Sequence, residues 1–124
     1  MIVTVNHHKT YCYTGNKPFN AVQPTAVFIH GVLNDHSVWA LQSRYLAHHG
    51  WNVLAVDLPG HCRSAGDAPA SVEAAAKFIT ALLDAVGVER AALVGHSWGS
   101  LIALEAASRL QDRIRASRHR QPRA

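Results

Sequence analysis

The chain has 124 residues, of which 48% are hydrophobic and 16% charged, with 8 glycines and 5 prolines. These values suit one globular domain and exclude a disordered chain, a collagen-like repeat and a disulfide-rich mini-protein. No stretch approaches the ~18–20 apolar residues of a membrane helix, and the N-terminus lacks the features of a signal peptide. We therefore expect a cytoplasmic protein with no membrane span.

Cys12 and Cys62 match neither a disulfide framework nor a zinc motif, so we expect free thiols and no metal site.

The formal net charge of +4 is concentrated at the C-terminus. Residues 109–124 hold six arginines and one aspartate, whereas residues 1–108 hold six basic and seven acidic residues. An arginine-rich segment without interleaved aromatic residues gives at most a salt-dependent, sequence-blind affinity for nucleic acid. We therefore expect no nucleic-acid partner.

Strand signals open the chain and then recur. Residues 2–5 and 9–13 are rich in β-formers and predict an antiparallel hairpin at one sheet edge. Residues 26–29, 53–56 and 91–94 are short apolar runs without polar alternation. Such runs are typical of strands that are buried on both faces of a parallel sheet.

Helical periodicity separates these runs and predicts helices over 37–48, 72–86 and 98–110. Ser71 is the expected N-cap of the second helix, and Gly87 follows its end. The order β-β-β-α-β-α-β-α predicts an α/β fold with right-handed crossovers. The apolar faces expected on the three helices are, in turn, Val38, Leu41 and Tyr45; Val72, Ala75, Ile79, Leu82 and Val86; and Ile102, Ala106 and Leu110.

The segment Gly95-His96-Ser97-Trp98-Gly99 follows an apolar strand and opens a helix. This is the context of a nucleophile elbow, in which a serine sits on a strained strand-to-helix turn. Glycines two residues before and after the serine avoid collisions with the neighbouring strand and helix. We therefore predict that Ser97 is a nucleophile and that the N–H of Trp98 donates to a developing oxyanion.

A second oxyanion donor is expected in the loop after an earlier strand. The pair His30-Gly31 follows the run 26–29 directly. The backbone N–H of Val32 is the predicted donor, and that of Leu33 is the neighbouring alternative. His30, Gly31, Gly95, His96 and Gly99 are then expected to support the turn and the pocket around it.

A third motif, Asp57-Leu58-Pro59-Gly60-His61-Cys62-Arg63-Ser64, follows the next strand. With the two motifs above, it makes residues 10–116 resemble the α/β-hydrolase superfamily. Members of that family often carry His-Gly, Asp-x-x-Gly-x-Gly-x-Ser and Gly-x-Ser-x-Gly after successive strands. In this chain Cys62 stands where a glycine is common, and we assign it no catalytic role.

The resemblance implies hydrolysis of a small-molecule ester or other acyl compound through Ser97, without a cofactor. A serine at the nucleophile position argues against the dehalogenase-type and epoxide-opening members. The same resemblance implies that a carboxylate and then a histidine follow the nucleophile, each after a later strand.

This chain offers only poor candidates for that carboxylate and that histidine. After Ser97 the only acids are Glu105 and Asp112, and the only histidine is His119. No apolar strand supports them, so we expect residues 1–116 to be the N-terminal part of a hydrolase domain and 117–124 to be a disordered, arginine-rich tail. The chain is then expected to be truncated and inactive, although a pairing of His30 with Ser97 stays open.

Two other interpretations remain. In the first, the chain is a non-catalytic remnant or interaction module that pairs, with a copy of itself or with a separately encoded C-terminal half, through an exposed strand at 91–94. A dinucleotide-binding domain is the structural runner-up, but the chain has neither a Gly-x-Gly-x-x-Gly motif nor a P-loop.

Overall fold

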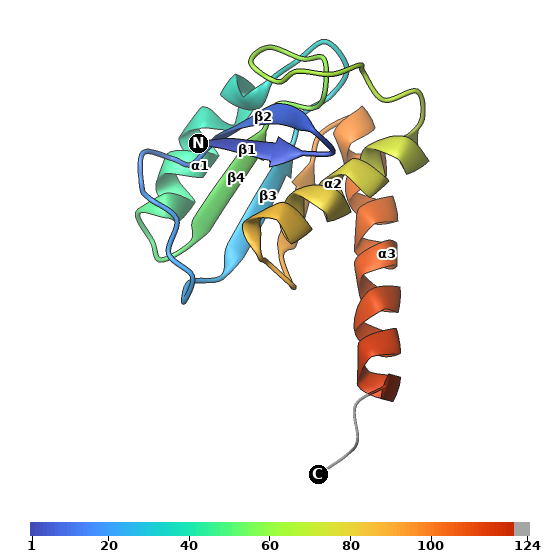
Figure 1. Cartoon of the computed structure of the whole chain (residues 1–124). Helices are drawn as coiled ribbons and strands as arrows, with labels where there is room; N and C mark the ends of the chain where they lie inside the picture. Colours follow the sequence, from blue (N-terminus) through green and yellow to red (C-terminus); the bar gives the residue numbers. More distant parts are fainter. Residues whose placement is uncertain (121–124) are drawn as a thin grey trace.

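A computed structural model describes the backbone of residues 1–120 and the side chains of residues 1–112. Its centre is a five-stranded sheet with the strand order β1-β2-β4-β3-β5. Strands β4, β3 and β5 are parallel, while the β1–β2 hairpin joins β4 in antiparallel fashion. The predicted α/β class, with a mostly parallel sheet, is therefore confirmed (Figure 1). The strands are β1 (Ile2–Val5), β2 (His8–Tyr13), β3 (Thr25–Ile29), β4 (Asn52–Val56) and β5 (Ala92–Gly95); the helices are the 3-10 helix η1 (His36–Trp39), α1 (Ala40–Ala47), α2 (Val72–Val86) and α3 (Trp98–Arg120).

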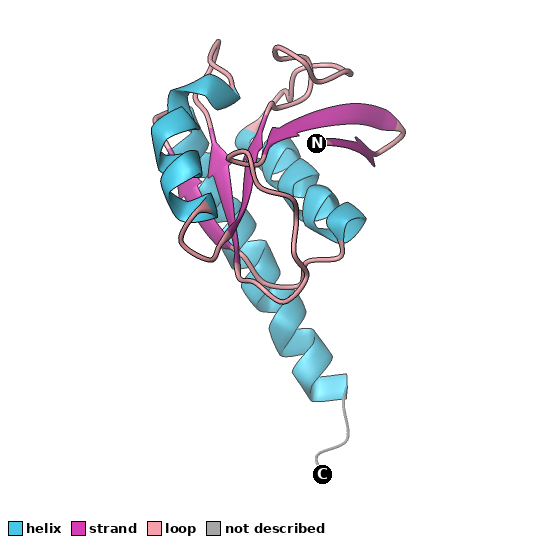
Figure 2. Ribbon diagram, turned by 90° about the vertical axis from the view of Figure 1, so that its left-hand side faces the viewer, coloured by secondary structure: helices cyan, strands magenta, loops and turns pink. Residues whose placement is uncertain are grey.

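The two faces of the sheet carry two separate apolar clusters, with α1 on one face and α2 and α3 on the other (Figure 2). Strand β3 shows why, because its side chains alternate between the faces. Ala26 and Phe28 pack on the α1 side, whereas Val27 and Ile29 pack on the α2–α3 side. All five residues of β3 and all five of β4 are buried, as the apolar runs predicted.

Helix α2 follows its sequence signals closely. The Ser71 side chain accepts a hydrogen bond from the Ala74 N–H at 3.0 Å, and Gly87 ends the helix in the left-handed region at φ 75°. The predicted face is buried against the sheet, with Ala75, Ile79 and Leu82 fully inaccessible.

The face predicted for α1 is wrong. Leu41 and Tyr45 are 76% and 63% exposed, and the buried residues of this helix are Ser43 and Ala47. The cause is a close approach of backbone at Gly15. A Cβ there would overlap the Ser43 carbonyl oxygen and lie 2.6 Å from the Ala47 Cβ. Only small residues fit at this contact, so the larger apolar side chains turn to solvent.

Strand β5 also departs from the prediction of burial on both faces, since its residues alternate between exposed and half-buried. Within residues 1–120 it pairs with β3 alone, so it forms an edge of the sheet. An edge strand lacks a neighbour to cover one side, which explains the exposure.

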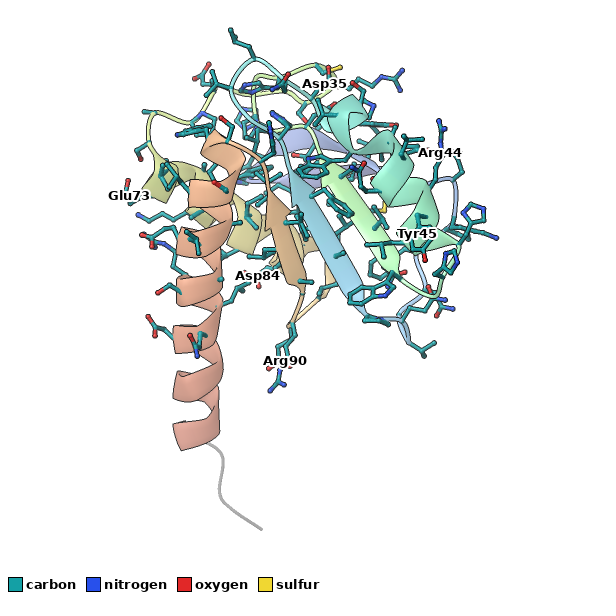
Figure 3. The ribbon with its side chains drawn as sticks, turned by 180° about the vertical axis from the view of Figure 1, so that it is seen from behind. Asp35, Arg44, Tyr45, Glu73, Asp84 and Arg90 are labelled. Carbon is teal, nitrogen blue, oxygen red and sulfur yellow. The ribbon has the colours of Figure 1, made fainter. Side chains whose placement is uncertain are left out.

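Helix α3 buries the predicted stripe of Ile102, Ala106 and Leu110 but continues ten residues beyond 110. Neither glycine nor proline occurs between Ser100 and Arg120, so the chain offers no stop signal there. Residues 117–120, predicted to be disordered, therefore continue the helix, and 121–124 lie outside the described residues. Figures 1 and 3 show this helix running past the sheet. Within the described chain, no helix is long and apolar enough to cross a membrane.

Candidate active site

The turn between β5 and α3 has the geometry expected of a nucleophile elbow. Ser97 adopts φ 58°, a left-handed conformation that is strained for a residue with a side chain. Its side chain is exposed. A Cβ at Gly95 would overlap the Gly99 carbonyl oxygen, and one at Gly99 would overlap that of Ile29. The two glycines thus leave room for the tight turn and for its close approach to β3.

The His-Gly loop lies directly against this turn. A Cβ built at Gly31 would lie 3.4 Å from the Ser97 Cβ and 3.4 Å from the His96 carbonyl oxygen. The His96 N–H also donates to the Ile29 carbonyl at 3.2 Å, which ties the turn to the end of β3. The two motifs, more than sixty residues apart in sequence, therefore form one site.

Val32 and Trp98, the residues predicted to supply the oxyanion donors, adjoin Gly31 and Ser97 in the chain. Trp98 is the first residue of α3, so its N–H lies among the unsatisfied groups at a helix N-terminus. Val32 follows Gly31 and is 55% exposed. Within the described chain, neither N–H donates a backbone hydrogen bond to another residue, so both are free for a ligand. The left-handed residue in this loop is Leu33, at φ 64°, rather than Gly31.

His30 is fully buried and acts as a link between two loops. Its Nδ1 donates to the Gly31 carbonyl at 2.7 Å, and its Nε2 accepts from the Leu58 N–H at 3.0 Å. Desolvation lowers the pKa of His30 below its usual 6.5, which keeps the ring neutral. Because both ring nitrogens are engaged, the alternative pairing of His30 with Ser97 does not form.

No base is hydrogen-bonded to the Ser97 hydroxyl in the described part of the chain. None of the histidine hydrogen bonds found there reaches its hydroxyl. Glu105 forms an ion pair with Arg109 at 3.5 Å. Asp112 lies 14 residues along α3, about 21 Å from the helix start at 1.5 Å per residue. The same rise places the backbone of His119 about 31 Å away, and its side chain lies outside the described residues.

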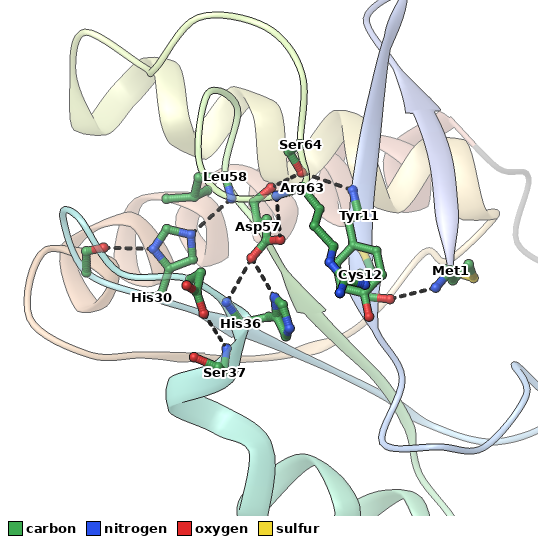
Figure 4. Close-up of polar contacts among 12 residues, drawn as sticks. Met1, Tyr11, Cys12, His30, His36, Ser37, Asp57, Leu58, Arg63 and Ser64 are labelled. Carbon is green, nitrogen blue, oxygen red and sulfur yellow. Dashed lines mark hydrogen bonds and ion pairs between the residues drawn. The ribbon is translucent and has the colours of Figure 1, made fainter.

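A polar cluster that the sequence analysis missed lies at the carboxyl ends of β3 and β4 (Figure 4). Asp57, whose side chain is fully buried, accepts from the His36 Nδ1 at 2.9 Å and from the His36 backbone N–H at 2.8 Å. Ligand atoms of His36, Asp57 and Cys62 all lie within 4.8 Å of one another. One sequence signal could have found this cluster. His36 follows β3 and Asp57 follows β4, and the ends of two neighbouring parallel strands lie at the same edge of the sheet.

The third motif, residues 57–64, is a firmly bonded loop. The Ser64 hydroxyl donates to the Asp57 carbonyl at 2.5 Å and accepts from the Tyr11 N–H at 2.9 Å. Cys62 adopts φ 45°, so the residue that stands where a glycine is common occupies a conformation that favours glycine. Partial desolvation, followed by the charges of Asp57 and Asp35, raises the pKa of the Cys62 thiol. A raised pKa lowers the thiolate fraction, so nothing at this position activates the thiol as a catalytic nucleophile.

Comparisons with known proteins agree with this geometry. The family model described as "alpha/beta hydrolase fold" matches residues 24–117. The chain belongs to this family. It is 34% identical over 96 residues to an epoxide hydrolase of Caballeronia sordidicola, covering 75% of this chain and 29% of that protein. It is 37% identical over 90 residues to the lipase LipV of Mycobacterium tuberculosis, covering 71% and 33% respectively.

Solved structures of α/β-hydrolases superpose on most of the chain. The crystal structure of a bacterial membrane phospholipase A matches with a TM-score of 0.80 at 30% identity, covering 90% of this chain and 36% of that one. The five-stranded sheet with its flanking helices is thus a partial α/β-hydrolase fold. The chain spans about a third of the length of these curated relatives.

Proposed function

We propose that this chain carries the nucleophile and the oxyanion cradle of a serine hydrolase that acts on esters or other acyl compounds. One observation carries the proposal: a strained, exposed Ser97 lies against the Gly31 loop, beside two free backbone N–H groups. This arrangement suits addition of an oxygen nucleophile to a carbonyl and stabilisation of the resulting oxyanion.

In the proposed reaction the Ser97 hydroxyl oxygen adds to the substrate's carbonyl carbon as its proton passes to a base. The carbonyl oxygen becomes an oxyanion and accepts hydrogen bonds from the Val32 and Trp98 N–H groups. Collapse of this intermediate breaks the bond to the leaving alcohol and leaves an acyl group on Ser97. Water then releases the acid by the same path.

The choice of substrate class rests on the nucleophile. Relatives named epoxide hydrolase and lipase are both similar to this chain. A serine forms an acyl intermediate that water can hydrolyse at its carbonyl carbon, whereas epoxide opening and dehalogenation in this family use aspartate. Position 97 is serine, so we favour carbonyl substrates.

A test that needs no base uses the Ser97→Cys variant, because a thiol is partly ionised near neutral pH without assistance. In a Cys62→Ser background, we expect p-nitrophenyl acetate to acylate this variant at least ten times faster than a Ser108→Cys control. Ser108 is exposed on α3, the same helix, but has no neighbouring oxyanion donors. Equal rates for the two thiols would show that the turn provides no catalytic environment.

We further infer that the 124-residue chain alone is inactive or very slow, because the described residues bring no base to Ser97. A fluorophosphonate probe is then expected to label the wild-type chain no faster than the Ser97→Ala variant. Probe attached specifically at Ser97 would overturn the inference of inactivity and would leave the proposed nucleophile intact.

The exposed edge at β5 favours a second candidate role, in which the chain is an interaction module. Val94 on β5 is 37% exposed, and Leu101 and Leu104 on the adjoining α3 are 52% and 71% exposed. Unpaired edge groups beside apolar side chains promote association, here with a second copy of the chain. We expect light scattering to detect oligomers that Val94→Lys dissociates and that Ile2→Lys, on the opposite edge strand β1, leaves unchanged. A monomeric wild-type chain would count against this role.

A further inference from the structure

Two loops meet on the β2 side of the candidate active site. One leads into η1 and contains Asp35 and His36, and the other is the loop 57–64 after β4. Because β4 and β5 are separated by β3, this junction lies about two strand spacings, ~10 Å, from the strand that leads to Ser97. It is therefore separate from the proposed nucleophile.

Asp57 is the centre of this junction and has no full counter-charge. Its side chain is 0% exposed, and the only ion-pair partner it has among the described residues is His36, which is charged only when protonated. Arg63 contributes its backbone N–H, at 3.2 Å from Oδ2, while its guanidinium carbon lies 5.0 Å from the centre of the Tyr11 ring. A buried carboxylate of this kind is stabilised by a bound cation.

The carboxylate also has room for another ligand. Its Oδ1 accepts the two hydrogen bonds from His36, whereas Oδ2 accepts only the bond from the Arg63 N–H. Since a carboxylate has about four lone-pair sites, Oδ2 can accept one more partner. The His36 Nδ1 and the Asp57 Oδ1 lie 2.9 Å apart in a hydrogen bond, whereas two tetrahedral zinc ligands lie about 3.3 Å apart, so a bound ion would replace this hydrogen bond with only a small movement of the ring.

Cys62, which lies in the same loop as Asp57, supplies the third potential ligand atom. Its thiol lies within 4.8 Å of both other ligand atoms, and the residue is exposed. An exposed position lets an ion enter from solvent and keep a water molecule as an additional ligand. Hydrogen bonds from Ser64 hold the loop that carries Asp57 and Cys62. The ligand atoms spread over as much as 4.8 Å, so the exposed thiol moves toward the ion as it binds.

We propose that His36, Asp57 and Cys62 form a binding site for a divalent transition-metal ion, for which zinc is the best match. Imidazole, carboxylate and thiolate are the protein ligands of zinc, and three of them with one water make a tetrahedral site. On binding, the His36 ring carries its proton on Nε2 so that Nδ1 can coordinate the ion, the Cys62 sulfur forms a bond to the metal, and the thiol proton leaves to solvent. The two loops are then joined by the ion.

The proposed metal site lies next to the hydrogen bonds that hold the loop carrying Gly31 and Val32. Leu58, adjacent to Asp57, donates its N–H to His30, which in turn bonds the Gly31 carbonyl. A metal ion that holds the 57–64 loop would therefore also stabilise the backbone that carries Val32. This makes the ion a structural brace rather than part of the reaction.

The test is a titration of the full-length chain with Co²⁺ in a non-thiol reductant, monitored by the thiolate-to-cobalt absorption band, followed by competition with Zn²⁺. We expect one ion per chain in the wild type and loss of the band in Cys62→Ser. For His36→Gln we expect affinity at least tenfold weaker. The His61→Gln variant is the matched control, because His61 lies in the same loop but outside the cluster, and its affinity should stay within about twofold.

Thermal unfolding separates binding from folding. A hundredfold excess of Zn²⁺ over its dissociation constant should raise the wild-type melting temperature by roughly 10 °C. Cys62→Ser should melt near the metal-free wild type and show no such rise, because Cys62 is exposed and its loss leaves the core intact. A wild-type chain that gives no cobalt band, or a band that persists in Cys62→Ser, would overturn the proposal.

Discussion

Gly99→Ala is the substitution whose effect follows most directly from the geometry of the turn. A methyl group there would overlap the Ile29 carbonyl oxygen and lie 2.7 Å from the His30 carbonyl oxygen. Both neighbours are backbone atoms at the end of a central strand, so no side-chain rotation relieves the overlap. Overpacking of this kind costs about 3 kcal/mol at the upper end of its usual range.

Helix propensity acts in the opposite direction and makes the sign of the result informative. Replacing a helical glycine by alanine stabilises by up to about 1 kcal/mol, so we expect a net loss of about 2 kcal/mol. Gly87→Ala is the control, because that glycine has open space around it but adopts φ 75°. Its expected loss of about 1 kcal/mol arises from backbone conformation alone.

Urea unfolding followed by circular dichroism measures both variants against the wild type. A Gly99→Ala chain as stable as the wild type, or more stable, would refute the close approach of the turn to β3.

Three further predictions concern single groups in the fold. Ser71→Ala removes the N-cap bond to the Ala74 N–H and should cost about 1 kcal/mol in a thermal melt; no loss would mean the cap is not formed in solution. Because burial lowers the pKa of His30, the unfolded chain gains a proton below pH 6.5 that the folded chain excludes; stability should therefore fall as pH drops below 6.5, by up to about 1.4 kcal/mol per pH unit from this group. His30→Gln should reduce that slope, and an unchanged slope would contradict the assignment. Burial raises the pKa of Cys12 to about 12, whereas Cys62 is exposed, so a thiol reagent should modify one cysteine per native chain and two after unfolding; rapid modification of both in the native chain would contradict this burial.

The parts of the fold that were predictable depend on local signals. Helix α2 has an N-cap, an apolar period and a terminal glycine within one continuous segment, and its predicted bounds are confirmed. The turn at Ser97 is likewise local, because two glycines and a strand-to-helix change determine its conformation.

The parts that failed depend on contacts between distant segments. The buried face of α1 is selected by its approach to Gly15, which no periodicity within the helix contains. The cluster of His36, Asp57 and Cys62 arises because β3 and β4 are neighbours, which brings together two loops that share no sequence motif. The roles assigned to Ser97, Val32 and Trp98 stay predictions that chemistry must test.

The measurement that tests the central claim most directly is a disulfide between Gly31→Cys and Ser97→Cys in a Cys62→Ser background. A Cβ at position 31 would lie 3.4 Å from the Ser97 Cβ, close to the 3.5–4.5 Å spacing of natural disulfides. Under mild oxidation we expect this pair to bridge, with the loss of two free thiols and about 2 Da in intact mass. The pair Gly31→Cys and Ser108→Cys should stay reduced under the same conditions. A Gly31→Cys, Ser97→Cys chain that keeps both thiols would contradict the account, because the His-Gly loop and the serine turn would not form one site.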